Sequence, residues 1–225
     1  MIRQDYIMRM IEQLVRVLME AAALKKAQKY TEALLTVDQA LQQLSGFDSK
    51  FVNSLPDDSL ITLLKTGDAL DADKCIIMAD LLEMEGDIYE VQGQFQESYY
   101  RHLKALNLFL AAFLSHTQTS LPHHFAQIEP IIEKLEPYDL PRETKHKLCL
   151  YYEQVGRYAQ AEDLLYELIE AEPGSNKLVG QGISFYQRLL QKNNQELITG
   201  NLPRAEIEEG LAELKVLRQG QTHLE

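Results

Sequence analysis

The chain of 225 residues has few glycines and prolines, only two cysteines and no long apolar run. Eleven Gly and seven Pro leave long stretches rich in Leu, Glu, Gln and Ala, which favour helix over sheet, and no alternating strand pattern occurs. Cys75 and Cys149 offer neither a disulfide framework nor a cysteine-based metal site, so we expect a reducing, cytoplasmic environment. Charged residues interrupt the apolar N-terminal segment, which argues against a signal peptide or a membrane span there.

Basic residues are also in deficit. The chain has 22 Lys and Arg against 34 Asp and Glu, so its formal net charge at pH 7 is −12. A surface of this charge repels nucleic acids and anionic lipid, which require clustered Lys and Arg. With 45% hydrophobic residues the chain can still bury a core. We therefore expect a protein or peptide partner, and neither nucleic acid nor a membrane.

Apolar residues recur at the three-and-four spacing of helices along most of the chain. This pattern predicts an all-α protein of about nine helices in a single domain over residues 1–218, followed by a flexible tail at 219–225. The helix expected from about Asp5 to Lys26 is apolar over a wide face, so it is expected to pack against more than one neighbour, within the chain or in a second copy. A loop is expected between Ser45 and Pro56, where the periodicity fails.

One six-residue pattern occurs three times. Its offsets are 0, 3, 7, 9, 12 and 19, and its members are Ala21, Leu24, Gln28, Tyr30, Ala33 and Ala40; Gly86, Tyr89, Gly93, Phe95, Ser98 and Ala105; and Cys149, Tyr152, Gly156, Tyr158, Ala161 and Leu168. Small residues allow two helices to approach closely, a Gly or polar residue forms the turn, and the aromatic residue covers the end of the hairpin.

This pattern resembles the tetratricopeptide repeat, a helical hairpin that mostly binds peptides and proteins; the match is best from Cys149 to Pro173. The resemblance implies antiparallel helical hairpins. Because the copies start 65 and 63 residues apart, extra single helices are expected between them. The stretches MIRQDYIMRMIEQL and GDALDADK also resemble an uncharacterised bacterial family, which implies no activity.

In tetratricopeptide repeats, side chains on the first helix of each hairpin face the binding groove. Transferred by position, these partner-binding residues are Val15, Leu18, Ala22 and Lys25 in the first copy, Asp80, Glu83, Asp87 and Glu90 in the second, and Glu143, His146, Leu150 and Glu153 in the third. The second set is one stripe of carboxylates, whose like charges cost about 0.2–0.5 kcal/mol per neighbouring pair. It predicts an acidic groove for a basic partner, although such a stripe can also be an ordinary solvated face.

Other patterns predict no chemistry. The segment around Asp71 lacks the Gly and Glu of a calcium loop, and His116, His123 and His124 are expected to be exposed loop residues, so no metal site is expected. His102 and His146 are expected at a helix surface or groove edge, the cysteines to be buried and inert, and Gly180-Gln181-Gly182 to be a close helix contact.

No nucleophile, base and orienting group can be placed together, so we expect no enzyme and no cofactor. The sequence predicts a non-catalytic protein- or peptide-binding adaptor. Two alternatives remain open: a sensor of a short signalling peptide that acts through a partner protein, and a structural homo-oligomer, with homodimer packing possible through the first or the last helix.

Overall fold

The computed structural model describes residues 2–222, and the side chains of residues 6–219. The protein is all-α, as expected. The described residues form twelve α-helices, more than the nine expected. By internal packing the chain divides into two compact units, Met1–Asp139 and Leu140–Glu225, where the sequence suggested one domain over 1–218. Each unit is described by itself.

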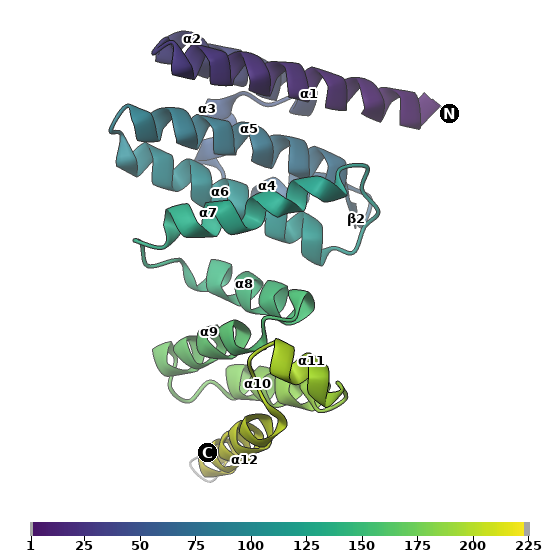
Figure 1. Ribbon diagram of the computed structural model, residues 1–225, viewed down its shortest axis with the longest axis vertical. Coiled ribbons are helices and arrows are strands. Elements are labelled where there is room, and N and C mark those ends of the chain that lie inside the picture. Colours follow the sequence, from purple (N-terminus) through teal and green to yellow (C-terminus); the bar gives the residue numbers. More distant parts are fainter. Residues whose placement is uncertain (1, 223–225) are drawn as a thin grey trace. The chain divides into compact units, whose positions relative to one another are not determined.

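The first unit is organised around one buried helix, α5. Its elements are α1 (Ile2–Lys26), α2 (Tyr30–Ser45), α3 (Ser49–Ser54), α4 (Asp57–Leu63), β1 (Lys65–Thr66), β2 (Ala69–Leu70), α5 (Ala72–Val91), α6 (Phe95–Leu114), the 3-10 helix η1 (Pro122–Gln127) and α7 (Ile128–Leu135). Helix α5 packs against α6, α2 and α1, and α7 packs against α6 (Figure 1). Thirteen of the 20 residues of α5 are buried, so this helix forms the centre of the core.

One expectation for the first unit was wrong, and one short element was not anticipated. The expected loop between Ser45 and Pro56 contains α3, which begins where the Asp48 carboxylate accepts a hydrogen bond of 2.7 Å from the backbone N–H of Phe51. The chain also has a strand pair, since β1 and β2 form a two-residue antiparallel hairpin around Gly67, whose φ is +64°. Both elements are too short to produce a periodic pattern.

The second unit is built of five helices: α8 (Arg142–Val155), α9 (Tyr158–Ala171), α10 (Asn176–Leu189), α11 (Asn194–Thr199) and α12 (Arg204–Thr222). Helix α12 packs against α10 (Figure 1). A Cβ added to Gly182 would lie 2.5 Å from Cδ1 of Leu214, so the close helix contact expected at this glycine is confirmed. Helix α12 continues to Thr222, beyond the expected end of the last helix at Arg218, and residues 223–225 of the expected tail lie outside the described residues.

The three copies of the sequence pattern form three hairpins with the same turn. At the turn position φ is +60°, +73° and +80°, in Gln28, Gly93 and Gly156. The same backbone hydrogen bond closes each turn, at 2.9, 2.9 and 2.8 Å, from Lys29 to Leu24, from Gln94 to Tyr89 and from Arg157 to Tyr152. This is the bond of a helix that ends in a left-handed residue. The repeat therefore corresponds to one local geometry used three times.

The helices of the described part of the chain are too short or too polar to span a lipid bilayer.

Candidate functional site

The acidic stripe of α5, formed by Asp80, Glu83, Asp87 and Glu90, is largely covered by other parts of the first unit. The side chains of the first three are 5%, 15% and 25% exposed, and only Glu90 is exposed. The groups that cover them are basic: His124 from η1, Lys134 from α7, Lys25 from α1 and His102 from α6. An ordinary solvated face would have left these carboxylates in water.

The buried Asp80 pairs with the half-buried His124, with 2.7 Å between a carboxylate oxygen and Nδ1. Burial raises the pKa of Asp80, although the hydrogen bond and charge of His124 oppose this. The hydrogen bond to Asp80 raises the pKa of His124. The expectation that His124 is an exposed loop residue was wrong, because the short 3-10 helix places it against α5.

Asp87 is the centre of the network. Its oxygens lie 2.8 Å from Nζ of Lys25 and 2.6 Å from Nζ of Lys134. Burial alone would raise the pKa of Asp87, but hydrogen bonds from one imidazole and two ammonium groups outweigh it and hold this pKa far below its ordinary value. The imidazole belongs to His102, whose Nε2 lies 3.3 Å from Oδ1 of Asp87. His102 is only 2% exposed, so the expectation that it lies at a helix surface or groove edge was wrong.

Asp87, Glu90 and His102 each offer one ligand atom, and these atoms lie within 4.8 Å of one another. Such a group could hold a metal ion in principle. Both oxygens of Asp87, however, already accept a hydrogen bond from an ammonium group. The two lysine charges oppose a further cation at the same place, so the arrangement balances its charge without one.

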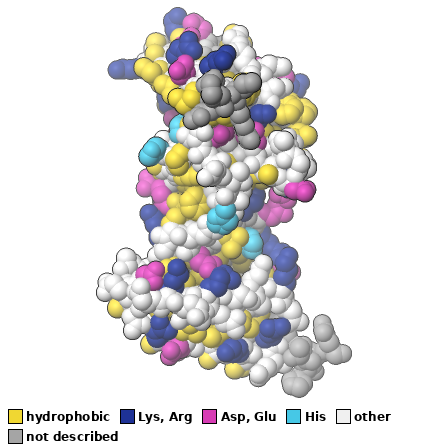
Figure 2. Space-filling model, turned by 90° about the vertical axis from the view of Figure 1, so that its right-hand side faces the viewer, with side chains coloured by type: hydrophobic (Ala, Val, Ile, Leu, Met, Phe, Trp, Pro, Cys, Tyr) yellow, Lys and Arg dark blue, Asp and Glu magenta, His cyan; other side chains and the backbone are white. Residues whose placement is uncertain are grey.

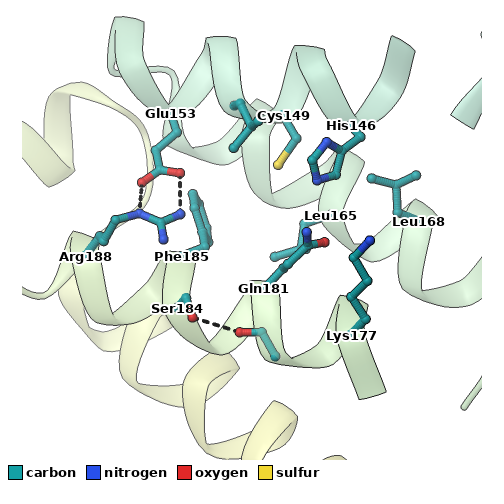
Figure 3. Close-up of a pocket in the computed structure, with 12 residues that line it drawn as sticks. His146, Cys149, Glu153, Leu165, Leu168, Lys177, Gln181, Ser184, Phe185 and Arg188 are labelled. Atoms are coloured by element: carbon teal, nitrogen blue, oxygen red, sulfur yellow. Dashed lines mark hydrogen bonds and ion pairs between the residues drawn. The ribbon is translucent and has the colours of Figure 1, made fainter. Parts of the chain in front are cut away.

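A cleft of about 490 Å³ opens in the second unit between α8, α9 and α10 (Figure 3). Its inner part is mostly apolar, formed by Cys149, Leu150, Leu165, Leu168 and Phe185, and its polar side chains are His146, Glu153, Lys177, Gln181, Ser184 and Arg188. Three of the four groove positions transferred to the third copy line this cleft, namely His146, Leu150 and Glu153. The fourth, Glu143, is exposed in the first turn of α8 and does not line it.

The polar side chains of the cleft include two cations, Lys177 and Arg188, and one carboxylate, Glu153. Nε and Nη2 of Arg188 lie 2.6 and 2.7 Å from the two oxygens of Glu153, a bidentate pair that neutralises the one carboxylate of the lining (Figure 3). Lys177 has no ion pair with any described residue. Burial, together with the charge of Lys177 and other nearby bases, lowers the pKa of His146. The cleft thus combines an apolar interior with one uncompensated ammonium group.

Gly180 leaves the α10 wall of the cleft open. A Cβ added here would meet nothing within 4 Å, whereas the same addition at Gly182 would collide with Leu214. A glycine inside a helix costs about 0.5–1 kcal/mol relative to alanine. Packing accounts for that cost at Gly182 but not at Gly180. The prediction that both glycines form a close helix contact was therefore wrong for Gly180.

The α10 side of the cleft was missed from the sequence. Lys177, Gln181, Ser184 and Arg188 follow one another at spacings of four, three and four, which is a polar stripe on one helical face. Such stripes usually face solvent, and nothing in the sequence indicates that this one faces α8.

The two cysteines are buried and free, and burial raises the pKa of each thiol to about 12. Cys149 donates a hydrogen bond of 3.3 Å to the carbonyl oxygen of Ala161 at the inner end of the cleft. Because the thiolate is the nucleophile, neither residue is suited to covalent chemistry.

The groove positions of the first copy lie on α1. Lys25 belongs to the network of Asp87, whereas Val15 is 45% exposed, and Leu18 and Ala22 are half-buried. The structure therefore distributes the predicted partner-binding residues over three different surroundings: an ion network, an exposed helix face and a cleft.

A family model described as a family of unknown function (DUF6483) matches residues 1–219, so the chain belongs to this family. No curated protein and no solved structure matches the chain.

Proposed function

We propose, for this member of a family without an assigned function, a non-catalytic role as a peptide-binding protein whose binding site is the α8–α10 cleft. The observation that carries the proposal is the open cleft itself, which presents an apolar interior beside the unpaired ammonium group of Lys177. Small-ligand and peptide sites have this composition, with few polar groups that set orientation on a mostly apolar surface. The resemblance of the three hairpins to tetratricopeptide repeats supports the same role, because those repeats mostly bind peptides.

The chemistry of the cleft favours a peptide with an apolar side chain next to a carboxylate. The apolar side chain would occupy the space between Leu150, Leu165 and Phe185. The carboxylate would pair with Lys177, since the only carboxylate of the lining, Glu153, is already bound to Arg188. The free, buried cysteines suit a reducing compartment, and we place the protein in the cytoplasm.

The test is a selection of displayed random peptides on the purified chain, followed by affinity measurements on variants of Gly180. Gly180→Leu would fill the cleft and weaken binding at least about tenfold, whereas Gly180→Ala adds one methyl group and serves as the matched control. Lys177→Glu would reverse the preference for acidic peptides. Peptides that bind Gly180→Leu and the wild type equally would contradict the proposal.

A second candidate is a basic partner at the acidic stripe, as the sequence suggested. The stripe already accepts basic groups, since Lys134 and His124 contact it from α7 and η1. An external basic peptide would have to displace these two side chains. A double variant, Lys134→Ala and His124→Ala, would then bind such a peptide more tightly than the wild type; unchanged affinity would exclude this candidate.

A further inference from the structure

Helix α1 has two apolar faces, and only one of them lies in the core. Ile7, Met10, Leu14 and Ala21 are buried against the rest of the first unit. A second row follows at spacings of three, four and four and comprises Met8, Ile11, Val15 and Met19, here named the α1 seam. Met8, Val15 and Met19 are 51%, 45% and 69% exposed, and Ile11 is half-buried. A row of exposed apolar side chains on one helix marks an interaction surface.

Four charged residues run beside the seam on its solvent side: Arg9, Glu12, Arg16 and Glu20. All four are exposed, and none has an ion pair with another described residue. Figure 2 views the molecule from the side on which α1 begins, and both dark blue basic groups and yellow hydrophobic groups are visible in its upper part. Any partner of the seam would meet this row of charges.

The order of these charges along the helix is self-complementary. When two copies of α1 lie antiparallel with Val15 near the crossing point, Arg9 of one copy lies opposite Glu20 of the other. The same register brings Glu12 of one copy within two residues of the position opposite Arg16 of the other, about 3 Å along the helix and within reach of long side chains. In a parallel two-fold pair the two charged rows would instead lie on opposite sides of the interface, so they would form no ion pairs with one another. The charge pattern therefore favours a second copy over an unrelated partner, and an antiparallel pairing over a parallel one.

We propose that this protein forms an antiparallel homodimer through the α1 seam. The apolar side chains of the two seams pack across the two-fold axis, and four ion pairs flank them, two for each copy of the chain. A two-fold interface requires one surface that complements itself, which the seam and its charged row provide on a single helix. The proposal is independent of the α8–α10 cleft, because no residue of α1 belongs to that cleft.

Charge exchange between two variants tests the pairing. One variant carries Arg9→Glu and Arg16→Glu, and the other carries Glu12→Arg and Glu20→Arg. We expect each alone to self-associate about a hundredfold more weakly than the wild type in sedimentation at low salt, since each flanking pair contributes a factor of about two to five and reversal adds repulsion. Mixed in equal amounts, the two variants should form a heterodimer of wild-type affinity.

Cysteine pairing provides a second measurement that does not depend on the charges. Protein with Met8→Cys, mixed with protein carrying Ala22→Cys, should form a mixed disulfide under mild oxidation, because antiparallel helices bring these two ends together. A control cysteine at the exposed Gln42 of α2 should not cross-link. A wild-type chain that sediments as a monomer, a dimer insensitive to charge reversal, or disulfides only between identical cysteine variants would each overturn the proposal.

Discussion

The acidic stripe of α5 and the α8–α10 cleft are two polar surfaces at equivalent positions of the repeated hairpin, and they differ in what covers them. The carboxylates of the stripe contact basic side chains from α1, α6, η1 and α7 of their own unit. The cleft retains about 490 Å³ of open space and an ammonium group without a counter-charge. The same position on the helix is thus covered by charged side chains in one hairpin and lines an open cleft in the other.

The reason for this difference is the segment that follows each hairpin. After α6 the chain turns back through η1 and α7, whose His124 and Lys134 reach the stripe. After α9 it continues into α10, which forms the opposite wall of the cleft rather than filling it. An ion pair exposed to water contributes little to the stability of a fold. Loss of one partner costs much more when another element shields the pair from water.

Replacement of Asp87 by Asn should have the largest effect on stability. The substitution leaves the ammonium groups of Lys25 and Lys134 half-buried without a carboxylate. We expect a loss of about 2–3 kcal/mol in the free energy of unfolding, less than the cost of breaking a fully buried pair, because Asp87 is still 25% exposed. Urea denaturation measures this loss. Glu90→Gln, on the same stripe but exposed, is the control and should change stability by about 0.5 kcal/mol or less.

Alanine at two helical glycines should give effects of opposite sign. A Cβ at Gly86 would lie 2.6 Å from the ring of His102, so Gly86→Ala should cost about 1–3 kcal/mol through overpacking. At Gly180 nothing lies within 4 Å, so Gly180→Ala should stabilise the chain by about 0.5–1 kcal/mol. Thermal unfolding of both variants provides the comparison. Equal destabilisation by the two substitutions would mean that Gly180 has a packing role after all.

The smallest effects concern two histidines that should titrate on opposite sides of pH 6.5. The pKa of His124 is raised by its hydrogen bond to Asp80, so the folded chain keeps a proton that the unfolded chain has lost. Its contribution to stability is present below pH 6.5 and is lost as pH rises through the folded pKa. The pKa of His146 is lowered by burial, so stability is lost as pH falls from 6.5 through its folded pKa.

Nuclear magnetic resonance titration of the imidazole carbon-bound protons would measure both values, with His124→Gln and His146→Gln used for assignment. A His124 that titrates below 6.5 would contradict its pairing with Asp80. A His146 that titrates above 6.5 would contradict the lowering of its pKa by burial.

Much of the fold could be predicted from the sequence because helices and hairpin turns depend on neighbouring residues. The three-and-four periodicity of apolar residues is sufficient to predict an all-α protein. The repeated pattern also predicts the turns at Gln28, Gly93 and Gly156, which share one backbone geometry. The missed elements, α3, α11 and the β1–β2 pair, are two to six residues long. Segments of this length are too short to show a hydrophobic period. Whether a short helix forms depends on local contacts such as the hydrogen bond at its first turn that Asp48 accepts.

The candidate sites depended on contacts that no local pattern contains. The spacing of Asp80, Glu83 and Asp87 shows that they share a helical face, but their partners His124 and Lys134 lie 44 to 51 residues further along the chain. The polar stripe of α10 became one side of a cleft only because α10 faces α8. Periodicity assigns residues to faces, whereas tertiary packing decides which face is covered and which charge is paired. The free energy of a charge depends on its surroundings in three dimensions, and the order of residues along the chain does not specify them.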